Sequence, residues 1–363
     1  MGGGMFRVAD YLIQAQQTFP TGTAQLRPLD TRGGGTWIFS LWILAKALGR
    51  ILQGRLSGNL AGVHVNVAER LSLFRKGAVV VLCRTIGIPV VLHLHAAKLP
   101  HFYQKMSRPL KGLTRWIFSL PASCLVLGDK ARQFVIQDLK VPDSQVEIII
   151  NGVPEPVYTR RADEKKRVMQ VLFLGNLSER KGVSDFLQSL ALPGFESIPM
   201  QVTLAGGGNV PFYQTVARQL GIDGFVRFMG WTDQQQVAQL MAQADVLVLP
   251  SYDEGLPLVI LEALSNGVAV ICTPVGEIPS LLSDGVNACF VRAGNVSEIA
   301  KSLQQVLMDS SYRGALELGG RALYEQRFSL IRFSANVALI HQRYFGKVIE
   351  PFKESLSAGS TPP

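Results

Sequence analysis

Glu254-Gly-Leu-Pro-Leu-Val-Ile-Leu-Glu262 carries the clearest structural signal in this chain of 363 residues. Just upstream, the sequence Ala-Asp-Val-Leu-Val-Leu-Pro-Ser at 244–251 has the length and apolar content of a short buried strand. The Gly-Leu-Pro turn interrupts that pattern, and the apolar run after it predicts the start of a helix. We therefore expect a strand, a tight loop and a helix, with Glu254 in the loop and Glu262 about two turns into the helix.

The two carboxylates at the ends of this stretch suggest a ligand. Glu254 and Glu262 stand eight positions apart and flank the start of the predicted helix. Amides that open a helix favour an anion, and a carboxylate accepts hydrogen bonds from two neighbouring hydroxyl groups at once. The pattern therefore predicts a site for an anionic ligand that also carries sugar hydroxyls.

Strand-like and helical segments alternate along the whole chain, which predicts an α/β protein with parallel sheets and crossover helices. In the first half we expect helices at residues 9–17 and 37–53, and strands at residues 62–67, 90–95, 123–127 and 146–150. In the second half we expect helices at residues 182–192 and 211–221, and strands at residues 168–174, 201–205, 226–229, 246–249, 268–271 and 289–291. The fold class is two doubly wound, Rossmann-like domains that face a cleft, with ligands at the carboxyl ends of the strands.

The domain boundary is predicted in the charged, proline-containing segment at 154–167, which has the composition of a hinge. The first domain then covers residues 1–154 and the second covers residues 155–334. A helix at about residues 335–350 is expected to pack back onto the first domain, and residues 352–363 read as a flexible tail.

The beginning of the chain departs from this pattern. A doubly wound domain starts with a strand that delivers a Gly-rich turn to a helix, but here the turn at Gly2 to Gly4 opens the chain. A missing central strand would leave ladder groups unpaired. We therefore expect the natural start to lie upstream; the alternative is a first domain that has lost its first strand.

Composition narrows the class of protein. The four cysteines are scattered and form no CxxC pair, which predicts buried reduced thiols rather than a disulfide framework or a zinc site. No signal peptide and no apolar run of about 20 residues is present, which favours a cytoplasmic location. Residues 1–160 carry 19 basic and 8 acidic residues, a net charge of +11, whereas the remainder carries −2. This asymmetry favours an anionic membrane surface or an anionic substrate; no nucleic-acid partner is expected.

Part of the basic charge recurs at helical spacing around Trp116-Ile-Phe118. The residues are Lys105, Arg108, Lys111 and Arg115. This spacing suits a helix that lies on a membrane whose inner face is negatively charged. An ordinary solvated helix face remains the alternative reading.

Two further motifs follow predicted strands. Arg180 and Lys181 lie on the loop that opens a helix after the strand at 168–174, where cations beside helix amides suit a diphosphate. His93 and His95 share one face of the strand at 90–95, and His95 ends it. A metal would need a third ligand of suitable spacing, and none is present, so a sugar contact or a structural role for these histidines is expected.

Together these motifs resemble the signatures of retaining nucleotide-sugar glycosyltransferases of family 4, which have the GT-B fold. The first motif is similar to the family's Glu-x7-Glu, the loop at 174–182 to Gly-Arg-Leu-x-x-x-Lys-Gly, and the segment at 93–96 to His-x-His-Gly. Asn176 stands where the family has an arginine, and Ala96 stands where it has a glycine.

The resemblance implies roles for particular residues. It makes His95, Glu254 and Lys181 the catalytic set, with Glu254 facing the donor sugar and Glu262 holding the nucleotide ribose. The other donor-binding residues that it implies are Arg180, Gly255, Leu256, Asn176 and Gly4. It implies neither a metal nor another cofactor, because the nucleotide-sugar is a substrate.

The function implied is transfer of a sugar, with retained configuration, from a nucleoside-diphosphate sugar to a glycan or lipid-linked acceptor. Cell-surface polysaccharide biosynthesis at the inner face of the membrane is the expected setting. A nucleotide-sugar epimerase of the same architecture and a non-catalytic scaffold remain alternatives. A nicotinamide-linked oxidoreductase would need the full GxGxxG after a strand, which the opening Gly-Gly-Gly-Met-Phe-Arg does not provide.

Overall fold

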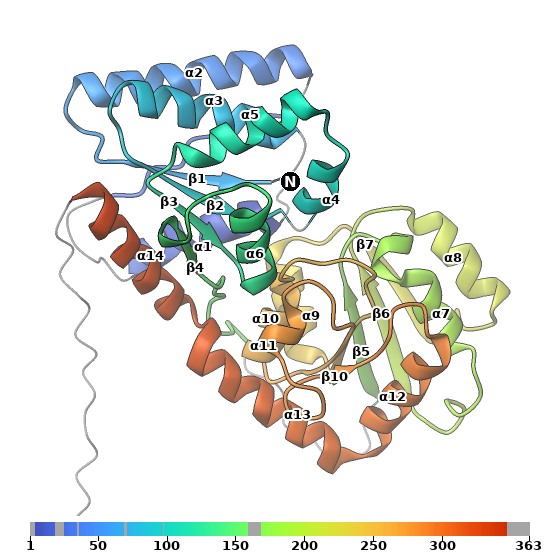
Figure 1. The fold of residues 1–363 in the computed structure, drawn as a ribbon. Helices are drawn as coiled ribbons and strands as arrows, with labels where there is room; N and C mark the ends of the chain where they lie inside the picture. Colours follow the sequence, from blue (N-terminus) through green and yellow to red (C-terminus); the bar gives the residue numbers. More distant parts are fainter. Residues whose placement is uncertain are drawn as a thin grey trace, which may run out of the picture.

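The computed structural model describes residues 4–18, 25–34, 36–68, 71–96, 98–158 and 168–346. Within these ranges the chain forms two parallel sheets, each covered by helices (Figure 1). The predicted tail at 352–363, Gly2, Gly3 and most of the predicted hinge lie outside the described residues.

The first sheet contains four parallel strands in the order β1-β2-β3-β4. These strands are Val63–Val67 (β1), Val90–Leu94 (β2), Ser123–Val126 (β3) and Val146–Ile148 (β4). The helices that connect them are Leu71–Thr85 (α3), Leu99–Gln104 (α4), Arg108–Ser119 (α5) and Asp129–Gln137 (α6). A further helix, Trp37–Leu56 (α2), packs on α3, on the side of the sheet away from the second domain (Figure 1).

The alternation of side chains along β2 separates two apolar cores. Val90, Leu92 and Leu94 pack with α3, α4, α5 and α6, whereas Val91 points to the opposite face. That face is covered by Gly4–Thr18 (α1) and Leu330–Phe345 (α14), which come from opposite ends of the described chain. All crossover helices therefore lie on one face, because the order of the described strands does not reverse.

Helix α14 begins at Leu330, about five residues before the predicted helix, and reaches the edge of the first sheet. Its Phe345 ring lies where a side chain on Gly62 would stand, since a Cβ there would be 2.2 Å from the ring. Helix α14, the last one within the described residues, is therefore packed against the first domain by close contacts.

The second sheet contains six parallel strands in the order β10-β9-β8-β5-β6-β7. The strands are Met169–Leu174 (β5), Met200–Ala205 (β6), Val226–Gly230 (β7), Val246–Leu249 (β8), Ala269–Cys272 (β9) and Cys289–Phe290 (β10). The helices are Val183–Leu190 (α7), Val210–Gln219 (α8), Gln234–Gln243 (α9), Leu258–Ser265 (α10), Ile278–Leu281 (α11), Val296–Met308 (α12) and Ser310–Leu323 (α13). The strand order reverses between β5 and β8, and ligands of open α/β sheets bind at the carboxyl ends of strands at such a reversal.

Two properties predicted from composition can be read from the structure. All four cysteines are buried and unpaired, as the sequence predicts. Among the residues that the structure describes, no helix is both long enough and apolar enough to cross a lipid bilayer.

Candidate functional site

The loops that follow β5 and β8 lie side by side, at the point where the strand order of the second sheet reverses. The amide of Tyr252 donates to the carbonyl oxygen of Arg180 at 2.9 Å. Gly182 has a φ of +68°, and a Cβ there would stand 2.2 Å from the carbonyl oxygen of Pro250. Only glycine permits both this backbone conformation and this approach, so the two loops are fixed against each other.

This contact brings Lys181 onto Glu254. The Nζ atom of Lys181 forms an ion pair with Oε1 of Glu254, and Nη1 of Arg180 lies 3.8 Å from the same oxygen. The side chains of Lys181 and Glu254 are 12% and 10% exposed, so both are largely removed from water. Two cations face one carboxylate, which leaves a net positive charge suited to an anionic ligand.

Gly255 and Leu256 hold the Glu254 loop in place. The carbonyl of Gly255 accepts the amide of Glu277 at 3.0 Å, and Leu256 is buried in the core. Gly276 packs so closely on the loop that a Cβ there would be 2.0 Å from the carbonyl oxygen of Glu254. The backbone around Glu254 is therefore fixed on both sides.

Glu262 lies in α10, but its carboxylate contacts the first helix of the chain. Oε1 accepts hydrogen bonds from Nη2 of Arg7 and, at 2.9 Å, from the hydroxyl of Tyr11. Burial raises the pKa of Glu262, and the adjacent Arg7 opposes that rise. Burial, reinforced by Glu262, also raises the pKa of Tyr11, which keeps its hydroxyl protonated as a donor.

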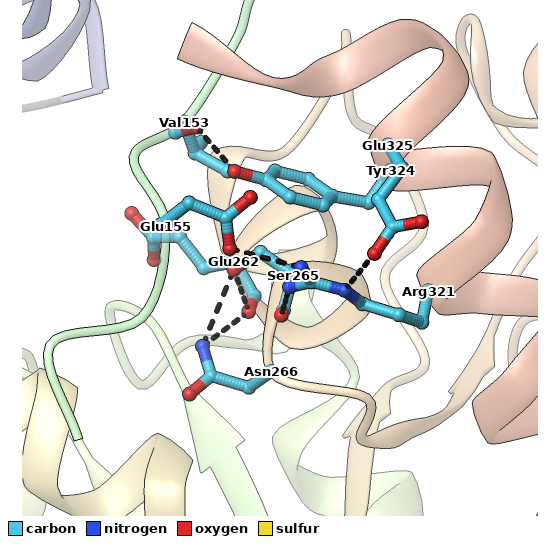
Figure 2. Close-up of polar contacts among 8 residues, drawn as sticks. All are labelled: Val153, Glu155, Glu262, Ser265, Asn266, Arg321, Tyr324 and Glu325. Atoms are coloured by element: carbon cyan, nitrogen blue, oxygen red, sulfur yellow. Dashed lines mark hydrogen bonds and ion pairs between the residues drawn. The ribbon is translucent and has the colours of Figure 1, made fainter. Parts of the chain in front are cut away.

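The other end of α10 is tied to the segment that leaves the first domain (Figure 2). The backbone carbonyl of Glu262 accepts from Nδ2 of Asn266 at 2.8 Å and from the Ser265 hydroxyl at 2.9 Å. Arg321 of α13 donates to the carbonyl of Ser265 and forms an ion pair of 3.0 Å with Glu155. Because Glu155 begins the connection between the domains, the helix that carries Glu262 is coupled to that connection.

His95 lies at the carboxyl end of β2, on the first domain. Its Nε2 is 2.9 Å from Oδ1 of Asn66, and burial lowers the pKa of His95 to about 3. Lys98, in the loop that follows, forms an ion pair of 3.7 Å with Asp253, the neighbour of Glu254. The loop after β2 therefore faces the loop after β8, although Asn66, the hydrogen-bond partner of His95, belongs to the first sheet.

His95 is one end of a row of four histidines. Its ring centroid lies 4.0 Å from that of His93; Nδ1 of His93 is 3.3 Å from His64, and the other nitrogen of His64 is 2.8 Å from His341. Burial lowers the pKa of His341 to about 4 and holds those of His64 and His93 well below the ordinary value, helped by the neighbouring imidazoles. Within the described ranges, no group of three or more His, Cys, Asp or Glu residues is arranged to hold a metal ion.

Asn176 and Gly4, the remaining predicted residues, lie at the edges of the site. The carbonyl of Asn176, in the loop after β5, accepts from the Ser178 hydroxyl at 3.3 Å. Gly4 opens α1 one turn before Arg7, and so lies at the end of the helix that reaches Glu262. Asn176 thus lies in the segment that leads to Lys181, and Gly4 lies in the helix that carries Arg7.

Sequence reasoning missed three residues that touch the site. Arg7 and Tyr11 share one face of α1, but nothing local in the sequence indicates a partner more than 250 positions away. Glu277 accepts the amides of Ala131 and Lys130 at the start of α6, across the two domains. Gly128 permits this contact, since a Cβ there would be 2.2 Å from the Glu277 carboxylate.

Part of the chain is similar to a known protein family. Residues 158–322 match the family model described as "Glycosyl transferases group 1". The matched range lies within the second domain and contains Lys181, Glu254 and Glu262.

Two relatives share parts of the sequence. An uncharacterised glycosyltransferase of Methanocaldococcus jannaschii is 26% identical over 254 residues, which cover 64% of this chain and 63% of that protein. The lipopolysaccharide core biosynthesis glycosyltransferase LpsE of Rhizobium meliloti is 32% identical over 161 residues, 44% of this chain and 45% of that protein. The chain thus spans less than two thirds of the length of either relative.

The similarity of the folds extends further than that of the sequences. The crystal structure of Anabaena HepE in complex with UDP and glucose superposes with a TM-score of 0.72 at 17% identity, covering 93% of this chain and 95% of that one. The two-domain GT-B architecture predicted from the sequence is therefore confirmed.

Proposed function

We propose that this protein is a retaining glycosyltransferase of family 4, which moves a sugar from a nucleoside-diphosphate sugar to a glycan or lipid-linked acceptor. The observation that carries the proposal is the contact of Lys181 with Glu254. This contact lies where the strand order of the second sheet reverses, within the range that matches the glycosyl transferases group 1 model. It joins a carboxylate, which suits sugar hydroxyls, to a cation, which suits a diphosphate. The likeness to a structure that holds UDP and glucose supports the same ligand class.

In the proposed reaction the bond between the anomeric carbon and the diphosphate oxygen breaks, and the acceptor oxygen attacks from the same face. The acceptor proton passes to the departing diphosphate, so no separate base is required. Lys181 and Arg180 stabilise the charge that grows on the diphosphate, which is the role of preorganised cations in such a step. These cations also make a metal unnecessary in this proposal, and chelation is expected to leave turnover intact.

Glu254 and His95 are proposed to position the sugar. A carboxylate accepts from sugar hydroxyls, and His95 is neutral near pH 7 because burial lowers its pKa to about 3. A neutral imidazole can exchange hydrogen bonds with a hydroxyl without adding charge to the site. His95 would reach the donor from the loop that Lys98 already holds against Asp253.

We further propose that the first domain works at the anionic inner face of a membrane, in polysaccharide biosynthesis. The basic helix α5 exposes Leu113 and Trp116, whereas Ile117 and Phe118, expected beside Trp116 at the interface, are buried. Helix α2, on the same side of the domain in Figure 1, adds Ile38 and Trp42, 63% and 56% exposed. Exposed aromatic and aliphatic side chains beside basic residues suit an interfacial helix. The named role of LpsE in lipopolysaccharide core biosynthesis supports this setting.

A donor panel tests the proposed reaction. The purified protein is incubated with several nucleoside-diphosphate sugars, and both the released nucleoside diphosphate and the sugar product are followed by NMR. Transfer or slow hydrolysis with retained anomeric configuration is expected. Epimerised nucleotide-sugar would favour the epimerase alternative, and no turnover of any donor would favour the scaffold.

A further inference from the structure

The contact between α1 and α10 leaves two buried polar atoms without a partner. They are Nε of Arg7 and Oε2 of Glu262. A guanidinium and a carboxylate often meet through two parallel hydrogen bonds, which would use both of these atoms. Here both Arg7 and Tyr11 donate to Oε1 instead. One donor of Arg7 and one acceptor of Glu262 therefore remain without a hydrogen bond, although the two side chains form an ion pair.

Bare buried groups of this kind destabilise a protein unless something binds them. The ligand that satisfies both must offer a donor to Glu262 and an acceptor to Arg7. A ribose hydroxyl is such a donor, and a phosphate oxygen is such an acceptor. The ribose–phosphate part of a nucleotide carries both groups on one molecule.

We propose that Arg7 and Tyr11 belong to the nucleotide site, so that the first helix of the chain completes the donor pocket of the second domain. This inference rests on the proposed function. The ribose donates to Oε2 of Glu262, and Arg7 donates from Nε to a phosphate oxygen. Tyr11 holds Oε1 at 2.9 Å and keeps the carboxylate turned toward the ribose.

The surroundings of Arg7 favour a ligand-binding role over a purely structural role in holding α1 in place. Its side chain is 28% exposed although Nε itself is buried, so a ligand reaches Nε when the end of the side chain turns. Val8, Leu12 and Ala15 on the same helix are buried in the core. These apolar residues already anchor α1. The charged pair is therefore not needed to hold the helix in place.

Binding of three probes to the full chain tests the inference by calorimetry. The probes are the nucleoside diphosphate that the wild type binds, its monophosphate and its free nucleoside. Arg7→Gln is expected to lower the affinity for the diphosphate and for the monophosphate by about tenfold or more. The affinity for the nucleoside should remain nearly unchanged. Arg7→Lys should recover part of the loss, and Tyr11→Phe should weaken all three probes by a few fold.

Arg218→Gln, a change of an exposed arginine on α8, is the matched control and should bind all three probes as the wild type does. Thermal unfolding of each variant separates a binding defect from a folding defect. Equal affinity of Arg7→Gln and wild type for the diphosphate, or an equal loss for diphosphate and nucleoside, would overturn the inference and leave the proposed function standing. Failure of the wild type to bind any nucleoside diphosphate would overturn both.

Discussion

The carboxylate of Glu277, in the second domain, accepts the backbone amide of Ala131, in the first, at 2.9 Å. It also accepts the amide of Lys130 at 3.3 Å, and so caps the start of α6 from outside that domain. Side-chain caps of this kind usually come from the residue that precedes the helix, which here is Gly128 and has no side chain to offer. The Glu277 carboxylate thus caps the N-terminus of α6 and links the two domains.

Glu277→Ala should therefore change both stability and domain arrangement. Loss of the cap should lower the free energy of unfolding by about 1 kcal/mol. Loss of the contact between domains should raise the radius of gyration measured by small-angle X-ray scattering. Asp233→Ala is the matched control, because Asp233 caps α9 within the second domain. The control should lower stability without altering the radius of gyration; an unchanged radius in both variants would contradict the bridging role.

Gly182→Ala tests how the Lys181 loop is positioned. The new Cβ would stand 2.2 Å from the carbonyl oxygen of Pro250, in a backbone conformation with φ of +68°. The loop must then move away from Glu254, so donor turnover and stability should both fall, stability by on the order of 1–3 kcal/mol. Gly221→Ala carries the same backbone penalty at φ +70° with nothing within 4 Å, and should lower stability less and leave turnover unchanged. Identical behaviour of the two variants would show that the approach to Pro250 is unimportant.

The row of histidines should make stability depend on pH. Because the pKa of His341 is lowered to about 4 and that of His95 to about 3, these imidazoles are neutral in the folded state, whereas the unfolded chain protonates them near pH 6.5. The stability that these neutral imidazoles contribute is fully present above pH 6.5. It is lost as the pH falls toward their pKa values in the folded state. Each contributes a slope of about 1.4 kcal/mol per pH unit in that window.

Urea unfolding at a series of pH values from 7.5 to about 5 measures this slope. His341→Gln should reduce the slope by about 1.4 kcal/mol per pH unit, the contribution of one titrating group. His101→Gln, a change of an exposed histidine on α4, should leave the slope unchanged. A slope that does not differ between wild type and His341→Gln would contradict the assignment.

The basic face of the first domain should bind anionic lipid vesicles, and the binding should weaken as salt rises. Changing Lys105, Arg108, Lys111 and Arg115 to Gln should abolish binding but leave donor hydrolysis intact. The control is the equivalent change of four exposed basic residues of the second domain, namely Arg218, Arg227, Arg292 and Lys301. Equal binding of the wild type to neutral and anionic vesicles would show that the charge plays no part.

The sequence predicted the strands well because strands of parallel sheets are buried on both faces and read as continuous apolar runs. β8 at Val246–Leu249 and β5 at Met169–Leu174 lie within a residue of their predicted bounds, so the loops carrying Glu254 and Lys181 could be placed at one edge of one sheet. The roles of the two residues remain predictions, but their contact follows from this placement.

Other parts of the site were beyond such reasoning. The partners of Glu262 and Glu277 come from the other domain, and pairings across 146 or 255 positions leave no local pattern. The side-chain contact of α1 with Glu262 of α10 also could not be inferred, because an amphipathic helix shows which face it buries and not what that face meets.

The kinetics of Lys181→Ala test the central claim most directly. If Lys181 stabilises the departing diphosphate, the variant should lower kcat for donor turnover by about 100-fold or more and change KM much less, because the charge is greatest in the transition state. Lys301→Ala, a change of an exposed lysine on α12, should match the wild type. A Lys181→Ala enzyme that keeps the wild-type kcat, or differs only in KM, would contradict the account.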